Sequence, residues 1–66
     1  MIKGKVKWYD DVKGFGFIET EEHGDVFVHR SGLEVQFGGL ENDQMVEFDV
    51  KQGPKGLVAV DVKSVG

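Results

Sequence analysis

Aromatic rings that alternate with small or β-branched residues are the side chains in this sequence best suited to bind a ligand. They occur in two short stretches, Lys13–Ile18 and Val26–His29. Successive side chains of an extended strand point to opposite faces. When the β-branched residues point inward, as they usually do in strands, one group of side chains is left outside: Phe15, Phe17, Phe27 and His29. The sequence therefore predicts an outward-facing aromatic surface.

Large rings gathered on a solvated sheet normally mark a binding surface. Flat rings flanked by lysine match an unpaired nucleic-acid strand, whose bases stack and whose phosphates need cations. Only two acidic residues, Asp10 and Asp11, fall within the first 13 residues. The same stretch holds four lysines: Lys3, Lys5, Lys7 and Lys13. These lysines taken alone are equally compatible with ordinary solubilising charge on a strand surface.

The chain has 66 residues, no cysteine and a formal net charge of −4. This length allows a single domain over residues 1–66 with a small core. The absence of thiols leaves no disulfide framework and fits a reducing compartment. No apolar run approaches the roughly 18 residues that span a bilayer, so we expect a soluble, cytoplasmic protein without a targeting segment. We also expect a monomer. The acidic balance disfavours a polyanionic partner unless the cations gather on one face.

Alternating apolar and polar residues predict five short strands, separated by turns, over residues 3–9, 15–21, 25–30, 46–51 and 57–65. The first three strands form a meander. An open sheet of this size would expose two edges, and closure removes them. We therefore expect an all-β fold, a small five-stranded antiparallel barrel.

Four further local features are predicted. Val6 points inward, and strict alternation places Trp8 inward too unless a bulge turns it outward. The Ser31-x-x-Glu34 pattern has the form of a capping box and predicts one helical turn. An irregular loop follows and contains Phe37, which either plugs the barrel edge or stacks on a base. In the last strand, alternation groups three valines on one face: Val58, Val60 and Val62.

Several stretches together resemble the cold-shock domain family: Gly4–Tyr9, Lys13–Ile18, Asp25–His29 with Ser31, the Gln44-x-Val46-x-Phe48 pattern and the Gly53-x-x-Gly56 turn. The resemblance covers essentially the whole chain. It implies a barrel of the oligonucleotide-binding (OB-fold) type that holds single-stranded RNA or DNA with little sequence demand. It also implies an RNA chaperone and a cold-shock-type regulator of transcription or translation.

The resemblance further implies which side chains contact the strand. Stacking on bases is implied for Trp8, Phe15, Phe17, Phe27, His29 and Phe37. Phosphate contacts are implied for Lys7 and Lys13, and we add Lys5 and Arg30 as cations of the same region. Arg30 stands where a further aromatic residue is common in the family, and a guanidinium can also stack on a base.

Other departures from the family pattern lie nearby. Tyr9 and Asp10 stand where phenylalanine and asparagine are common, and the loop over residues 34–40 is one residue short. Leu57 and Val58 replace a common Pro-Gln pair, which puts a base contact there in doubt.

Two other classes of function compete with nucleic-acid binding. No nucleophile, base and orienting group stand out, so we expect neither an enzyme nor a cofactor or small-molecule substrate. His23 and His29 with Asp25 are the candidate metal ligands, but one histidine lies in a turn and the other on the aromatic face, so no metal is expected. A small barrel that grips an extended or proline-rich peptide with its aromatic residues is the stronger rival. The interleaved lysines favour nucleic acid.

Overall fold

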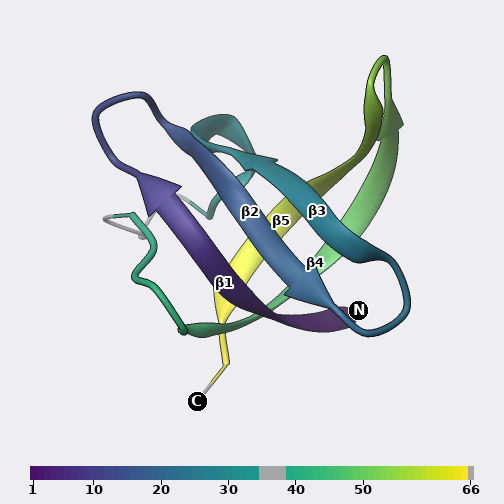
Figure 1. The fold of residues 1–66 in the computed structure, drawn as a ribbon, viewed down its shortest axis with the longest axis horizontal. Helices are drawn as coiled ribbons and strands as arrows, with labels where there is room; N and C mark the ends of the chain where they lie inside the picture. Colours follow the sequence, from purple (N-terminus) through teal and green to yellow (C-terminus); the bar gives the residue numbers. More distant parts are fainter. Residues whose placement is uncertain (35–38, 66) are drawn as a thin grey trace.

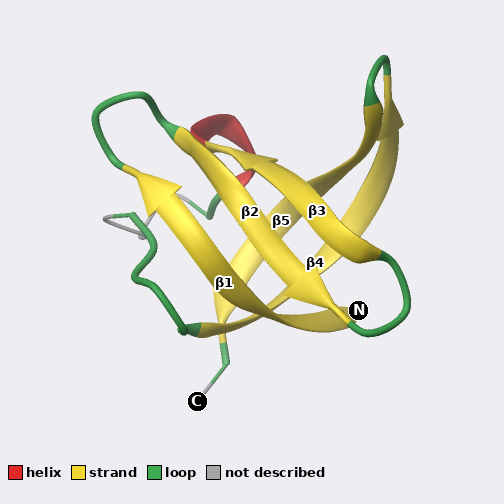
Figure 2. Cartoon of the chain, in the orientation of Figure 1, coloured by secondary structure: helices red, strands yellow, loops and turns green. Residues whose placement is uncertain are grey.

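The computed structural model describes residues 1–34 and 39–65. Phe37 lies outside the described residues. Five strands and one short 3₁₀ helix follow in the order β1 (Ile2–Asp10), β2 (Phe15–Thr20), β3 (Gly24–His29), η1 (Arg30–Gly32), β4 (Met45–Gly53) and β5 (Gly56–Ser64). Figure 1 shows them curving around one interior, and Figure 2 shows how little of the described chain is helical. The five predicted strands are confirmed.

The strands close into a barrel in the order β1-β2-β3-β5-β4. The pairs β1–β2, β2–β3, β1–β4 and β4–β5 are antiparallel. The β3–β5 pair is parallel, so the prediction of a purely antiparallel barrel was wrong at this seam. The seam is short, with Phe27 opposite Val58 and Val28 opposite Ala59. The predicted all-β barrel itself is confirmed.

The interior is filled mainly by aliphatic side chains from alternate strand positions. Ile18, Val26 and Val28 are fully buried, as are Val6 and Phe48. Burying a side chain of this size contributes roughly 1.5–3 kcal/mol relative to leaving it exposed. Because β2 and β3 keep strict alternation, burial of their aliphatic residues places their phenylalanines on the outer surface, as predicted.

A β-bulge in β1 decides the direction of Trp8. Val6 lies opposite Ile18, but Trp8 lies opposite Phe17, so Lys7 is an extra residue in β1. The bulge moves Trp8 onto the same outer face as the phenylalanines of β2. The alternative in which a bulge turns Trp8 outward is confirmed, and strict alternation fails here.

The same bulge brings the β1 backbone close to Gly16. A Cβ atom at Gly16 would overlap the Trp8 carbonyl oxygen and lie 2.7 Å from the Tyr9 Cα. Backbone cannot move aside as a flexible side chain can. We therefore expect Gly16→Val to lower the free energy of unfolding by at least about 1–3 kcal/mol, the usual cost of overpacking. A lower urea midpoint measures this loss, and weaker oligonucleotide binding should accompany it.

The control is Glu19→Val, which places the same side chain on the same strand at an exposed position. This control should unfold at nearly the wild-type midpoint. A Gly16→Val variant that unfolds at the wild-type midpoint and binds normally would contradict close packing at Gly16.

A second irregularity lies in β5, where Asp61 has a φ of 54° and the register with β4 shifts. Two residues of β5 there face one residue of β4, so the alternation is reset. Ala59 and Val62 are consequently the fully buried residues of β5. The prediction that Val58, Val60 and Val62 share one face was wrong, because Val62 lies beyond the bulge.

The helical turn begins one residue earlier than predicted and uses a different cap. His29 is the N-cap, and its Nδ1 accepts a hydrogen bond from the Ser31 backbone N–H. The predicted Ser31–Glu34 capping box was wrong, because the chain is already extended at Leu33. There the Glu34 N–H donates to the Val62 carbonyl at 3.0 Å. In the part of the chain that the structure describes, no helix is long and apolar enough to cross a membrane.

Candidate nucleic-acid interface

Four rings meet on the outer face of β1, β2 and β3, and we call them the aromatic cluster: Trp8, Phe15, Phe17 and Phe27. Trp8 lies 5.8 Å from Phe15 and 5.6 Å from Phe17 between ring centroids. Phe27 lies 5.9 Å from Phe15 and 5.8 Å from Phe17. Each ring therefore contacts two others. Trp8 is 38% exposed, and the three phenylalanines are half-buried.

Strand register brings these rings together. Trp8, Phe17 and Phe27 form one row across three strands, and Phe15 lies opposite His29 in the next row. His29 is exposed at the border of the cluster. Its Nδ1 accepts the backbone N–H of Ser31 at 3.1 Å, so the neutral ring carries its proton on Nε2. That N–H is a hydrogen-bond donor beside the rings.

Lys7, the bulge residue of β1, forms an ion pair with β3. Its Nζ donates to Asp25 Oδ2 at 2.9 Å, with both side chains about half exposed. This hydrogen bond, aided by the charges of Asp25 and Glu19, raises the pKa of Lys7 above its usual value. A raised lysine pKa keeps the ammonium charged throughout the physiological pH range. Lys7 is therefore a permanent cation beside the Trp8–Phe17–Phe27 row.

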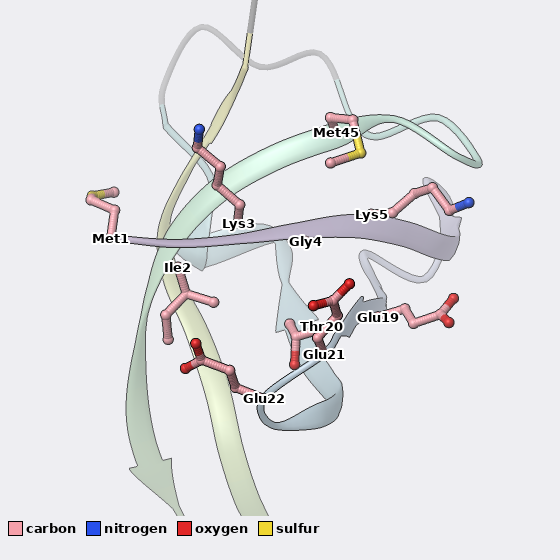
Figure 3. A pocket seen from close by; sticks show the side chains of 10 residues that line it. All are labelled: Met1, Ile2, Lys3, Gly4, Lys5, Glu19, Thr20, Glu21, Glu22 and Met45. Atoms are coloured by element: carbon pink, nitrogen blue, oxygen red, sulfur yellow. The ribbon is translucent and has the colours of Figure 1, made fainter.

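Lys5 lies further from the rings. It is opposite Glu19 on β2 and Met45 on β4, and its Nζ is 4.0 Å from Asp43 Oδ1. Figure 3 shows it at the rim of a pocket of about 680 Å³ at the end of the barrel near Met1. Lys5 thus lies beyond the aromatic cluster, beside Glu19 and Asp43.

Lys13 lies in the tight turn between β1 and β2. Asp10 Oδ1 accepts the backbone N–H groups of Val12 at 2.9 Å and Lys13 at 3.0 Å. Gly14 closes the turn with a φ of 80°, a conformation that glycine adopts at little cost. The turn therefore holds the Lys13 backbone immediately before Phe15.

Arg30 reaches over this turn from η1. Its Nη2 donates to the Asp11 carbonyl at 2.6 Å, and its backbone N–H donates to the Gly14 carbonyl at 2.7 Å. A Cβ atom at Gly14 would lie 3.2–3.3 Å from Nη2, Cζ and Nε of Arg30. Such nearly equal distances place one face of the guanidinium against Gly14. Arg30 thus fixes the turn that carries Lys13, a contact that the sequence pattern did not indicate.

A family model described as the "Cold-shock" DNA-binding domain matches residues 2–65. The chain belongs to the cold-shock DNA-binding domain family. Nucleic-acid binding is therefore its function, and the predicted membership is confirmed. The peptide-binding barrel is not favoured.

Relatives of similar length support the same conclusion. A cold shock-like protein of Thermotoga maritima is 51% identical over 97% of this chain and 98% of its own length. Cold shock-like protein CspA of Stigmatella aurantiaca is 49% identical over 98% of each. Cold shock protein CspC of Bacillus subtilis is 48% identical over 96% of this chain and 97% of its own.

A solved structure shows the same fold at low sequence identity. The chain named drosophila Unr CSD456 superposes with a TM-score of 0.80 at 23% identity, over 98% of this chain and 26% of that one. At this identity the likeness shows the fold alone. It confirms that the barrel of this cold-shock domain is of the OB-fold type.

Among residues 1–34 and 39–65, no three side chains of histidine, aspartate or glutamate gather closely enough to hold a metal ion. His23 Nε2 lies 4.0 Å from Glu22 Oε2 in the β2–β3 turn, whereas His29 is bound to Ser31.

One feature beside the aromatic cluster was not predicted from the sequence. The β4–β5 hairpin and two rings of the cluster enclose a hollow of about 410 Å³, lined by Phe17, Phe27, Pro54, Lys55, Gly56, Leu57 and Val58. The signal in the sequence was the Leu57-Val58 run after the Pro54 turn, which stands where the family commonly has a Pro-Gln pair. That run was assigned to the last strand, and nothing in the pattern placed it beside β3.

Proposed function

We propose that this cold-shock domain binds single-stranded RNA and DNA with little sequence preference, by stacking bases on the aromatic cluster. The observation that carries the proposal is the position of the four rings outside a barrel whose interior is filled by other side chains. Rings that are not needed in the core and remain partly exposed are available to a ligand. Because every base has a π-face, stacking discriminates weakly among bases.

The surrounding cations support phosphate binding. Lys7 borders the rings, Lys13 and Arg30 lie at the adjacent turn, and Lys5 lies one row beyond. We propose that about three to five phosphates are contacted, although the net charge of −4 will keep the affinity low at high salt. As a monomer in the cytoplasm, where RNA is abundant, the protein would act as an RNA chaperone.

Trp8 is the only tryptophan, so its fluorescence reports directly on the aromatic cluster. Oligo-dT should quench it, because a base stacked on the indole contacts the emitting ring. Titrations at several salt concentrations give the slope of log affinity against log salt. At about −0.7 per phosphate for single strands, three to five contacts predict a slope of roughly −2 to −3.5. A slope near zero, typical of an aromatic peptide groove, would contradict the proposal.

Lys13→Gln tests one phosphate contact. The variant should reduce the magnitude of the slope by about 0.7 and weaken binding at low salt. Lys3→Gln is the matched control, because it makes the same charge change on the exposed part of β1 beside Met1 and Ile2. An unchanged slope in Lys13→Gln, or an equal change in both variants, would remove Lys13 from the interface.

A further inference from the structure

Arg30 holds the β1–β2 turn through three separate contacts. Its Nη2 donates to the Asp11 carbonyl at 2.6 Å, and its backbone N–H donates to the Gly14 carbonyl at 2.7 Å. One face of its guanidinium lies against Gly14. Asp11 and Gly14 flank Val12 and Lys13 in the sequence. Arg30 is therefore attached to the chain on both sides of the tip of the turn.

Apolar packing does not hold the tip of this turn. Val12, the apolar side chain of the tip, is 92% exposed. The bonds from the Val12 and Lys13 N–H groups to Asp10 Oδ1 define the shape of the turn but do not join it to another element. Segments with few buried apolar contacts open at low free energy. Lys13 therefore depends on contacts such as those of Arg30 for a fixed position.

The chemistry of a guanidinium suits this role. Its plane can lie flat on a glycine while its N–H groups donate within that plane, whereas a lysine ammonium is a compact charge on a flexible stem. The family commonly has an aromatic residue at this position, and a phenyl ring has no N–H group to donate to the Asp11 carbonyl. Arg30 therefore makes a contact that a phenylalanine cannot make.

We propose that Arg30 is a positioning residue of the interface and strengthens binding mainly by holding Lys13 in place for a phosphate of the bound strand. The inference rests on the proposed function, in which Lys13 contacts a phosphate next to the aromatic cluster. Ordering a side chain or a loop during binding weakens association, and ordering it beforehand avoids that loss. Arg30 thus acts through the turn, rather than as an independent contact to a base or a phosphate.

A double-mutant cycle tests this role. Arg30→Lys keeps the positive charge but removes the flat face and the fixed geometry of the donors. It should weaken oligo-dT binding about two- to tenfold, the usual effect of leaving one side chain to be ordered on binding. Lys13→Gln should then weaken binding less in the Arg30→Lys protein than in the wild type, because Lys13 is already displaced there. Urea midpoints check that each variant is folded.

Lys7→Gln is the matched control, because it makes the same charge change beside the cluster at a residue that pairs with Asp25 of β3 instead of joining the turn. Its fold-change should be equal with and without Arg30→Lys. If the effects of Arg30→Lys and Lys13→Gln multiply fully, Arg30 acts independently and the proposal is overturned. An equal reduction of both lysine effects would also overturn it, because the change would then not be specific to the turn.

The wild-type protein offers a test that needs no variant. In the free protein, the NMR order parameter of the Lys13 backbone N–H should match that of Phe15 in β2, at about 0.85 for rigid backbone. A lower value at Lys13 than at Phe15 would refute the proposal, because the turn would not be held before binding. If the Arg30→Lys protein does not fold, this measurement decides alone.

Failure of this inference can be distinguished from failure of the proposed function. If oligo-dT quenches Trp8 but the effects of Arg30→Lys and Lys13→Gln multiply, positioning is wrong and stacking stands. The same conclusion follows if Lys13→Gln has no effect in the wild type. If oligo-dT does not bind at all, both proposals fail.

Discussion

We expect a DNA duplex to bind this protein at least about a thousandfold more weakly than either of its separated strands. Paired and stacked bases cannot offer their faces to Phe15, Phe17 and Phe27. Even a site of about four nucleotides, the lower limit for OB-folds, requires three stacking steps to open. At roughly 1.4 kcal/mol per step, this costs about 4 kcal/mol. Competition against a labelled oligo-dT measures the difference.

The duplex and the single strands must share one sequence and one length, so that only strand pairing differs. At low salt, the lysines should preserve some duplex binding. Raising the salt should abolish duplex binding before it abolishes single-strand binding. Equal affinity for duplex and single strand would contradict stacking on the aromatic cluster, whatever the salt dependence.

The same arithmetic limits what an RNA chaperone of this kind can unfold. A protein present at about 100 times its dissociation constant stabilises the unpaired state by roughly 2.7 kcal/mol per site. This compensates for about two stacking steps at roughly 1.4 kcal/mol each. Short or mismatched hairpins would therefore open, whereas long helices would remain paired unless several molecules bind along one strand.

The sequence was sufficient to predict the aromatic face because β2 and β3 alternate without interruption. Ile18, Val26 and Val28 are all fully buried, so a period of two places Phe15, Phe17 and Phe27 outside. The same reasoning did not decide whether Trp8 points inward or outward, and it wrongly grouped Val62 with Val58 and Val60 on one face. Both lie next to a bulge, and a bulge depends on how the partner strand crosses, which the sequence of one strand does not contain.

Contacts between segments distant in the sequence were equally inaccessible. The Ser31-x-x-Glu34 pattern favours a capping box locally, but Glu34 instead pairs with Val62 of β5. Arg30 reaches the Asp11 carbonyl across 19 positions of the chain. The hollow beside the β4–β5 hairpin forms because β5 pairs with β3. Each of these contacts depends on closure of the barrel, which a local sequence motif does not describe.

The aromatic cluster makes a second large prediction, because stability and binding should respond separately at its rings. We expect Phe15→Ala, Phe17→Ala and Phe27→Ala each to weaken oligo-dT binding by about 1–3 kcal/mol, or roughly 5- to 150-fold, the cost of one lost base stack. Their half-buried rings should cost less stability than the roughly 3–5 kcal/mol of a core Phe→Ala change. Each variant requires a urea midpoint and an oligo-dT dissociation constant.

Phe48→Ala is the matched control, since it removes the same side chain from a fully buried site. A domain of 66 residues has a total stability of roughly 3–10 kcal/mol, so this variant should be largely unfolded or close to it. The rings of the aromatic cluster contact one another, so double variants need not lose the sum of the single effects. If all three surface variants stay folded with wild-type affinity, bases do not stack on this cluster. If they unfold as Phe48→Ala does, the rings are part of the core, and their exposure has no binding role.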